Sequence, residues 1–287
     1  MDQLWDATSL IQRGFNSMLD YKLYKSKKAN CSETIVLIHG LGGNYGIFCH
    51  QIAAYKKEYD VLAINLPGHG KSPSTDSYDM PFNRELVADE VILLLDELKI
   101  SKAHLVGISL GSVAVHHLLQ RVPERVQSAV LGGAITRYAP LATFMLRAGN
   151  AVKAFVPYMW LYKMFAYIMM PKANHASSRK LFIREALKMN RRDFLAWYAL
   201  TPQVNAAYAN VQQYSQNIPK LYISGEQDHL FLDPLLEDTK SDEQAQHLIL
   251  EQCGHVCNVE KPREFNDASL AFFNQHSSTQ SSISSAL

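Results

Sequence analysis

Short apolar runs alternate with segments of helical periodicity along most of this chain. The runs predict strands at residues 20–24, 34–38, 61–66, 103–107, 126–131, 220–224 and 247–250. Amphipathic helices are predicted at residues 83–98, 110–120 and 262–274, the first with Leu86, Val87, Val91, Leu94, Leu95 and Leu98 on its buried side. Strands that alternate with helices are typical of a mostly parallel sheet covered on both faces. We therefore predict an α/β fold.

This alternation stops after Ala134. Residues 137–213 contain no strand candidate and predict several helices, punctuated by Pro140, Pro157, Pro171 and Pro202. Strand character returns at Lys220. We therefore predict a core of residues 1–136 and 214–276, an inserted helical cap of residues 137–213, and a serine-rich, disordered tail of residues 277–287.

The predicted cap differs chemically from the rest of the chain. Between Arg137 and Leu200 there are 11 Lys or Arg against Glu185 and Asp193, a net charge of +9. Because the whole chain carries +1, the remainder carries −8. The same segment holds 12 of the 29 aromatic residues and six of the nine methionines. Two interpretations follow: the lysines form the solvated face of a lid, or an apolar lid lines a pocket while its basic rim meets an anionic head group or an anionic membrane surface.

Composition also bounds the compartment and the partners. The near-neutral charge gives no reason to expect nucleic acid. Residues 1–16 contain Asp2 and Asp6 and resemble no secretory signal, whereas Leu4, Ile11, Phe15 and Met18 share one face of an amphipathic helix. The longest apolar stretch, residues 155–171, is shorter than the about 20 residues that cross a bilayer. We expect a soluble cytoplasmic protein with four reduced cysteines.

The most informative motif is Gly107-Ile108-Ser109-Leu110-Gly111, because it lies between a predicted strand and a predicted helix. A serine there occupies a sharp turn of positive φ, and its hydroxyl lies at the positive end of the helix. Close backbone contacts in such a turn leave little room for side chains at the flanking glycines. We predict that Ser109 is a nucleophile.

A serine hydroxyl needs a base and an orienting carboxylate before it becomes a good nucleophile. Asp228 follows the strand at 220–224 and His255 follows the strand at 247–250, so both leave the sheet at the edge where Ser109 lies. The rival bases are His104, His116, His117, His229 and His247, and the rival acids are Glu226 and Asp233. We favour His255, on its glycine-flanked loop, as base and Asp228 as acid. A metal site at Cys253, His255 and Cys257 is disfavoured because no second pair of ligands has suitable spacing.

Two backbone N–H groups are needed to stabilise an oxyanion. Leu110, directly after the serine, supplies one by position. The glycine-rich loop His39-Gly40-Leu41-Gly42-Gly43 is expected to supply the other from Leu41. No Gly-Lys-Ser or Gly-Lys-Thr sequence follows that loop, which disfavours a nucleotide site.

Together with Leu66-Pro67-Gly68-His69-Gly70-Lys71-Ser72, these motifs resemble the α/β-hydrolase fold family, with a helical cap inserted after the sixth strand. The resemblance covers about Asp20 to Gln275. It implies a carboxylic ester hydrolase of class EC 3.1.1 with an acyl-enzyme on Ser109. Because the nucleophile is serine, relatives that use aspartate there, the epoxide hydrolases and haloalkane dehalogenases, are disfavoured. We expect neither a cofactor nor a metal.

The expected substrate is a small, hydrophobic ester or acyl compound, with His39, Gly40, Tyr158, Trp160 and Met164 in its binding site. Cleavage of a carbon–carbon bond in a dienoate, or of a thioester, suits the basic cap equally well if the substrate is anionic. A ligand receptor that retains the triad is a third hypothesis, and peripheral contact of the cap with an anionic membrane a fourth.

Overall fold

The computed structural model describes residues 19–29, 31–153, 155–204, 208 and 211–277. The predicted N-terminal helix face and residues 278–287 of the predicted tail lie outside these ranges. Within them, no helix combines the length and the apolar character that crossing a bilayer requires.

Seven strands form one sheet in the order β1-β3-β2-β4-β5-β6-β7. Their bounds are β1 Tyr21–Tyr24, β2 Thr34–Ile38, β3 Asp60–Ile64, β4 Ala103–Ile108, β5 Val126–Gly132, β6 Lys220–Gly225 and β7 Ala245–Leu250. Only β1 pairs antiparallel to its neighbour, and the other pairings are parallel. All five residues of β2 are buried, as expected for a strand covered on both faces. The predicted mostly parallel α/β sheet is confirmed.

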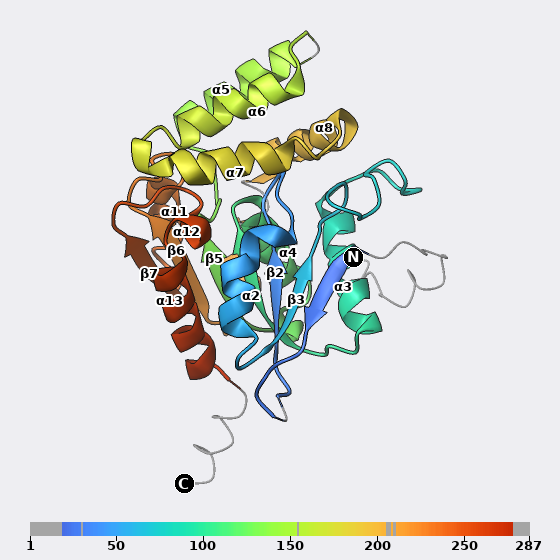
Figure 1. Ribbon diagram of the computed structural model, residues 1–287, viewed down its shortest axis with the longest axis vertical. Coiled ribbons are helices and arrows are strands. Elements are labelled where there is room, and N and C mark those ends of the chain that lie inside the picture. The colour runs from blue at the N-terminus through green and yellow to red at the C-terminus, as the bar shows by residue number, and fades with distance from the viewer. Residues whose placement is uncertain (1–18, 30, 154, 205–207, 209–210, 278–287) are drawn as a thin grey trace.

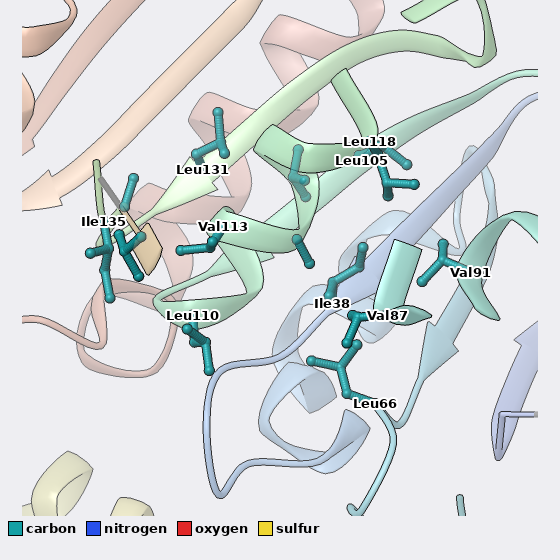
Figure 2. Packing of buried hydrophobic residues seen from close by; sticks show 14 of the residues in the cluster. Ile38, Leu66, Val87, Val91, Leu105, Leu110, Val113, Leu118, Leu131 and Ile135 are labelled. Atoms are coloured by element: carbon teal, nitrogen blue, oxygen red, sulfur yellow. The ribbon is translucent and has the colours of Figure 1, made fainter. Parts of the chain in front are cut away.

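Helices cover both faces of the sheet (Figure 1). On one face α3 (Arg84–Glu97) and α4 (Leu110–Arg121) pack their apolar sides against Ile38, Leu105 and Leu131, as Figure 2 shows. On the other face, α2 (Cys49–Tyr55) and α13 (Pro262–Gln275) pack on Ile35 and Leu37. Alternate residues of β2 thus belong to opposite core layers, as strand geometry requires. Helix α2 was not predicted, because its seven residues bury only Gln51, Ile52 and Tyr55.

A helical insert separates β5 from β6. It contains α5 (Pro140–Val152), α6 (Tyr158–Met169) and α7 (Ala176–Ala186), and α8 (Arg191–Leu200) follows. Figure 1 shows these helices stacked across one end of the sheet. Five strands precede the insert in the described residues, so the expected position after a sixth strand was wrong. The count is five because one strand, the antiparallel β1, precedes the strand that carries the glycine-rich loop in the described residues. The domain limits at residues 137 and 213 stay a prediction.

Polar contacts attach this insert to the loop after β3. The buried Asp193 carboxylate of α8 accepts hydrogen bonds from the N–H and the hydroxyl of Thr75, both at 2.7 Å. The Trp197 indole N–H donates to the Pro67 carbonyl at 2.8 Å. Bonds to a buried carboxylate are stronger than neutral ones. They hold α8 against the core.

The short helices α10 (Val211–Tyr214), α11 (Leu232–Asp238) and α12 (Cys257–Glu260) complete the described part of the fold. Helix α11 follows β6 and α12 follows β7. The segments between each strand and its helix therefore leave the carboxyl edge of the sheet. The functional candidates lie at this edge.

Candidate active site

Ser109 occupies the sharp turn between β4 and α4. Its φ of 54° and ψ of −122° lie in a region that a residue with a Cβ adopts only under strain. The turn is held because the Ser109 N–H donates to the Gly132 carbonyl at 2.9 Å. A Cβ on Gly107 would lie 2.6 Å from the Gly111 carbonyl oxygen, and one on Gly111 would lie 2.3 Å from that of Ile38. The predicted positive φ is thus present, and the flanking glycines are needed for space.

Ser109, His255 and Asp228 form one hydrogen-bonded chain. The distance from His255 Nε2 to Ser109 Oγ is 2.8 Å, and that from His255 Nδ1 to Asp228 Oδ2 is 2.7 Å. Asp228 and His255 are buried, whereas Ser109 is partly exposed. An ionised Asp228 can only accept, so Nδ1 carries the proton and Nε2 is free to accept the Ser109 hydroxyl proton.

Backbone contacts between neighbouring loops place the acid and the histidine. The Gln227 N–H donates to the Cys253 carbonyl at 2.9 Å, which ties the loop after β6 to the loop after β7. Gly225 packs so closely on the second loop that a Cβ would lie 2.2 Å from the Gly254 carbonyl oxygen. Gly133, with φ of 51°, makes a similar contact with the His255 carbonyl. The loops that follow the neighbouring parallel strands β5, β6 and β7 thus meet at one point.

The rival candidates lie elsewhere. His229, Glu226 and Asp233 are exposed on the surface. The imidazoles of His104 and His116 are buried in the core, where they hydrogen-bond with Ser128 and Tyr222 respectively. None of these five takes part in the hydrogen-bonded chain at Ser109 in the described structure.

The glycine-rich loop after β2 runs alongside Ser109. A Cβ on Gly40 would lie 3.0 Å from the Ser109 Cβ, so the two backbones approach closely. Leu41 and Leu110 both line the cavity onto which Ser109 opens. The Tyr162 hydroxyl of α6 donates to the Leu41 carbonyl at 2.9 Å and so ties this loop to the insert. The oxyanion role of the two N–H groups stays a prediction.

Ser109 opens on an apolar cavity between the sheet edge and the insert. The cavity holds about 770 Å³ of empty space, part of it continuous with solvent, and no charged side chain lines it. Its wall is made of Leu41, Ser109, Leu110, Ile135, Tyr138, Met145, Leu146, Gly149, Leu161, Tyr162, Met164, Phe165, Met169, Phe182, Phe194, Tyr198, Thr201 and Phe231. A smaller cavity of about 410 Å³, which Gly40 lines, shares Leu41, Ser109 and Phe182 with it. The serine therefore faces two spaces, the larger lined by no charged side chain and the smaller mostly apolar with Glu185 in its wall.

Residues 33–160 match the family of the alpha/beta hydrolase fold. The chain has the α/β-hydrolase fold. Among solved structures, this hydrolase-fold chain is similar to Est816, described as an N-acyl homoserine lactone degrading enzyme, with a TM-score of 0.73 and 22% identity over 88% of this chain and 96% of that one. The meta-cleavage product hydrolase CumD of Pseudomonas fluorescens gives a TM-score of 0.71 and 23% identity over 90% and 94%. Identities this low support a shared fold and leave the reaction open.

Curated relatives of this hydrolase-fold chain carry different activities in their names. RutD of Pantoea ananatis (strain LMG 20103), named as a carbamate hydrolase, is 27% identical over 265 residues, which cover 90% of this chain and 94% of RutD. The dihydrolipoyllysine-residue acetyltransferase component of the acetoin cleaving system of Pseudomonas putida is 27% identical over 256 residues, 84% of this chain and 64% of that protein. The substrate must therefore be argued from the cavity.

Two of the predicted substrate residues of the hydrolase lie away from the larger cavity. Trp160 is 72% exposed on the surface of α6, and the Tyr158 hydroxyl donates to the Met189 carbonyl at 2.7 Å. A role of either in substrate binding stays a prediction, because periodicity does not show which face of an inserted helix turns toward the core. Met164, four residues after Trp160, does line the cavity.

His39 was also expected at the substrate, and in the structure its imidazole bonds to backbone groups of Gly40 and Leu66. Its imidazole is buried, with Nδ1 2.8 Å from the Gly40 carbonyl and Nε2 accepting from the Leu66 N–H at 3.1 Å. His69, which we did not predict, accepts from the Gly42 N–H at 3.0 Å. Burial holds the pKa of His39 well below 6.5 and lowers that of His69 to about 4, so both rings stay neutral acceptors. They fix the glycine-rich loop.

The cysteines beside His255 have structural surroundings. The buried Cys257 thiol contacts the Ile223 carbonyl at 3.3 Å, and burial raises the pKa of the Cys253 thiol to about 12. Both therefore stay protonated at neutral pH. In the described ranges, no three His, Cys, Asp or Glu side chains gather as a metal site would need.

Proposed function

We propose that this chain is a serine hydrolase that cleaves carboxylic esters with a hydrophobic acyl group through an acyl-enzyme on Ser109. The observation that carries the proposal is the juxtaposition of the Ser109–His255–Asp228 hydrogen bonds with an uncharged, apolar cavity. His255 is the base, and Asp228 is the acid that orients it.

The reaction has two halves. Ser109 Oγ attacks the acyl carbon while His255 Nε2 takes the hydroxyl proton, and the carbonyl oxygen becomes an oxyanion that accepts from the N–H groups of Leu41 and Leu110. The intermediate collapses as His255 gives the proton to the leaving alcohol. Water then attacks the acyl-enzyme with His255 again as base, and the carboxylic acid leaves. Asp228 stabilises the imidazolium in both halves.

The character of the cavity selects among the candidate substrates. An anionic dienoate or a charged thioester would lose its water shell against a wall of Leu, Met, Phe and Tyr side chains with no cation to pair it. An alkyl acyl chain gains about 0.8 kcal/mol per methylene that leaves water. The wall therefore supports a neutral ester with an apolar acyl group.

The two cavities suggest where the acyl part and the alcohol part of such a substrate bind. Phe182, on α7, lines both spaces and stacks on Tyr162 with ring centroids 4.7 Å apart. The larger space takes the acyl chain, and the smaller space takes the leaving alcohol. Because both contain Ser109, an ester carbonyl at the serine has an apolar exit on each side.

The test compares Ser109→Ala with Ser112→Ala on p-nitrophenyl esters of increasing acyl length. Ser112 lies in the first turn of α4 and donates its hydroxyl to the Ser109 carbonyl at 2.6 Å, so its variant controls for disturbance of the elbow. We expect Ser109→Ala to lose turnover while Ser112→Ala retains it. In the parent chain, kcat/KM should rise with acyl length up to a maximum. Retained turnover in Ser109→Ala, or tight binding of esters by the parent without turnover, contradicts the proposal, and the second result favours a receptor.

A further inference from the structure

The outer helices of the insert carry apolar side chains that face solvent. Phe144 on α5, Phe155 in the turn after α5, and Trp160 and Tyr167 on α6 are between 58% and 89% exposed. In Figure 1, α5 and α6 lie at the end of the molecule opposite the C-terminal end of α13. Scattered exposed apolar residues are ordinary, but large aromatic side chains concentrated at one end mark an interaction surface.

The exposed residues of α6 follow the helical repeat. Trp160, Lys163, Met164 and Tyr167 are all exposed, and their spacing of three, one and three residues places them in one stripe. The opposite side of α6 packs inward through the buried Tyr162, Ala166 and Met169. Helix α6 thus has apolar side chains on both its buried and its exposed side. A helix that is buried on one side only normally has polar residues on the other side. Its outer stripe is available for a partner.

The charge around this stripe is of one sign. Between Arg137 and Arg184 the sequence has eight Lys or Arg and no Asp or Glu. Arg137 pairs with Glu237 and Asp238, and Arg184 pairs with Glu185. No ion pair involves the exposed Arg147 and Lys163 among the residues that the structure describes. These two cations therefore stand beside exposed aromatic rings with their charge uncompensated.

We infer that this outer face, defined by Phe144, Arg147, Phe155, Lys163 and Tyr167, docks on an anionic phospholipid bilayer. Aromatic rings enter the interface between head groups and acyl chains, and basic side chains beside them meet the lipid phosphates and carboxylates. A second copy of the chain presents the same positive charge and is repelled. An anionic lipid surface supplies both the opposite charge and an apolar layer for the rings.

The docking face is continuous with the proposed acyl site. Met164 belongs to the exposed stripe of α6, at 46% exposure, and also lines the cavity at Ser109. An apolar ester held in the bilayer would therefore meet the cavity wall where the protein meets the lipid. This extension rests on the proposed function, whereas the docking itself does not require turnover.

The experiment is sedimentation of the full chain with vesicles of phosphatidylcholine, with and without phosphatidylserine. We expect binding that requires phosphatidylserine and weakens with added salt. Each basic side chain near such a surface contributes about fivefold to the partition coefficient, so Arg147→Glu combined with Lys163→Glu should lower it by at least about 25-fold. Phe144→Ser combined with Phe155→Ser should lower it as well. The Ser109→Ala chain should sediment like the parent, so a failure of docking is distinguished from a failure of catalysis.

The matched control is Lys102→Glu, which reverses an exposed charge next to the first residue of β4, at the opposite edge of the sheet from the insert. The partition coefficient of Lys102→Glu should fall only by the small amount that a change in net charge causes. Hydrolysis of a short soluble ester should proceed at the parent rate in all the charge variants. The inference is overturned if the parent does not sediment with phosphatidylserine vesicles. It is overturned equally if Lys102→Glu lowers the partition coefficient as much as Lys163→Glu alone, for which we expect at least about fivefold, or if the parent self-associates through this face without lipid.

Discussion

Replacement of Asp228 by Asn tests the role of the buried carboxylate without changing its shape. In the parent, Asp228 Oδ2 lies 2.7 Å from His255 Nδ1, and both side chains are buried. An Asn at this position can turn its amide N–H₂ toward Nδ1. The imidazole then carries its proton on Nε2 and cannot accept the hydroxyl proton of Ser109.

The size of the effect follows from the charge that appears during the reaction. The imidazolium and the carboxylate attract each other by about 4 kcal/mol at a separation of about 4 Å and an effective dielectric constant of about 20. That energy corresponds to a factor of about 10³ in rate. The wrong tautomer adds to this loss, and we expect kcat to fall by about 10³ to 10⁴.

Stability should respond in a different way. Asp228 Oδ1 is buried and has no hydrogen-bond partner among the described residues. A buried charge that is incompletely paired costs free energy of folding. The neutral amide removes that charge, so the thermal midpoint of Asp228→Asn should not fall below that of the parent.

The assay is steady-state hydrolysis of a short p-nitrophenyl ester, with thermal unfolding measured on the same preparations. Glu226→Gln is the matched control, because it neutralises an exposed carboxylate on the same loop. It should keep kcat close to the parent value. A loss of less than about tenfold in Asp228→Asn, where one tenfold step is about 1.36 kcal/mol, would refute the reasoning. Equal losses in the two variants would refute it as well.

Three further substitutions test how the fold supports the site. Gly111→Ala should prevent folding or strongly lower the thermal midpoint, because its Cβ would lie 2.3 Å from a carbonyl oxygen of β2; a parent-like melting curve contradicts this. Tyr162→Phe removes the hydrogen bond to the Leu41 carbonyl and should lower the midpoint by about 2 °C, for about 1 kcal/mol, and also lower kcat, whereas Tyr158→Phe should lower the midpoint alone; equal kcat in the two variants would count against a role of this loop. Burial raises the pKa of Glu90 from 4.5 to about 7, so folding favours its protonated form and this contribution to stability is lost as pH rises from about 4.5 through 7. Glu90→Gln should therefore raise the melting midpoint more at pH above about 7 than at pH below about 4.5, and an equal change in both ranges contradicts the assignment.

The core of the fold could be predicted from the sequence because the local hydrophobic pattern and the tertiary environment favour the same structure there. The strand at Thr34–Ile38 was predicted with the observed bounds, since Thr34 is followed by a continuous run of four apolar residues, as is usual for a strand covered on both faces. The turn at Ser109 was predicted because two glycines, an apolar run and a helix all require the same backbone path. All seven strands of the described sheet and three of the main helices were predicted for this reason.

The insert could not be predicted to the same degree. Helix α6 is apolar around most of its circumference, so periodicity does not tell the side that faces the cavity from the side that faces solvent. Trp160 and Tyr158 were therefore placed at the substrate, whereas Leu161 and Phe165 line the cavity. The orientation of α6 is set by tertiary contacts such as the bond from Tyr162 to the glycine-rich loop.

The histidines show the same limit for polar residues. His39 and His69 stand in glycine-rich motifs that also occur at catalytic loops, and residue type alone made His39 a candidate for substrate binding. Their bonds from the Leu66 N–H to His39 and from the Gly42 N–H to His69 each join residues 27 positions apart in the chain. The presence of a second histidine, His69, in the neighbouring motif was the available signal that the two rings support a loop.

Labelling by a fluorophosphonate, followed by mass spectrometry of the digested chain, tests the central claim most directly. The probe forms a stable bond only with a serine whose hydroxyl has been activated by a base. We predict one adduct on the peptide that carries Ser109, present in the parent and in Ser112→Ala, and strongly reduced in rate in a His255→Gln variant. An adduct on another serine, or no adduct under conditions in which the chain is folded, would contradict the assignment of Ser109 as the nucleophile.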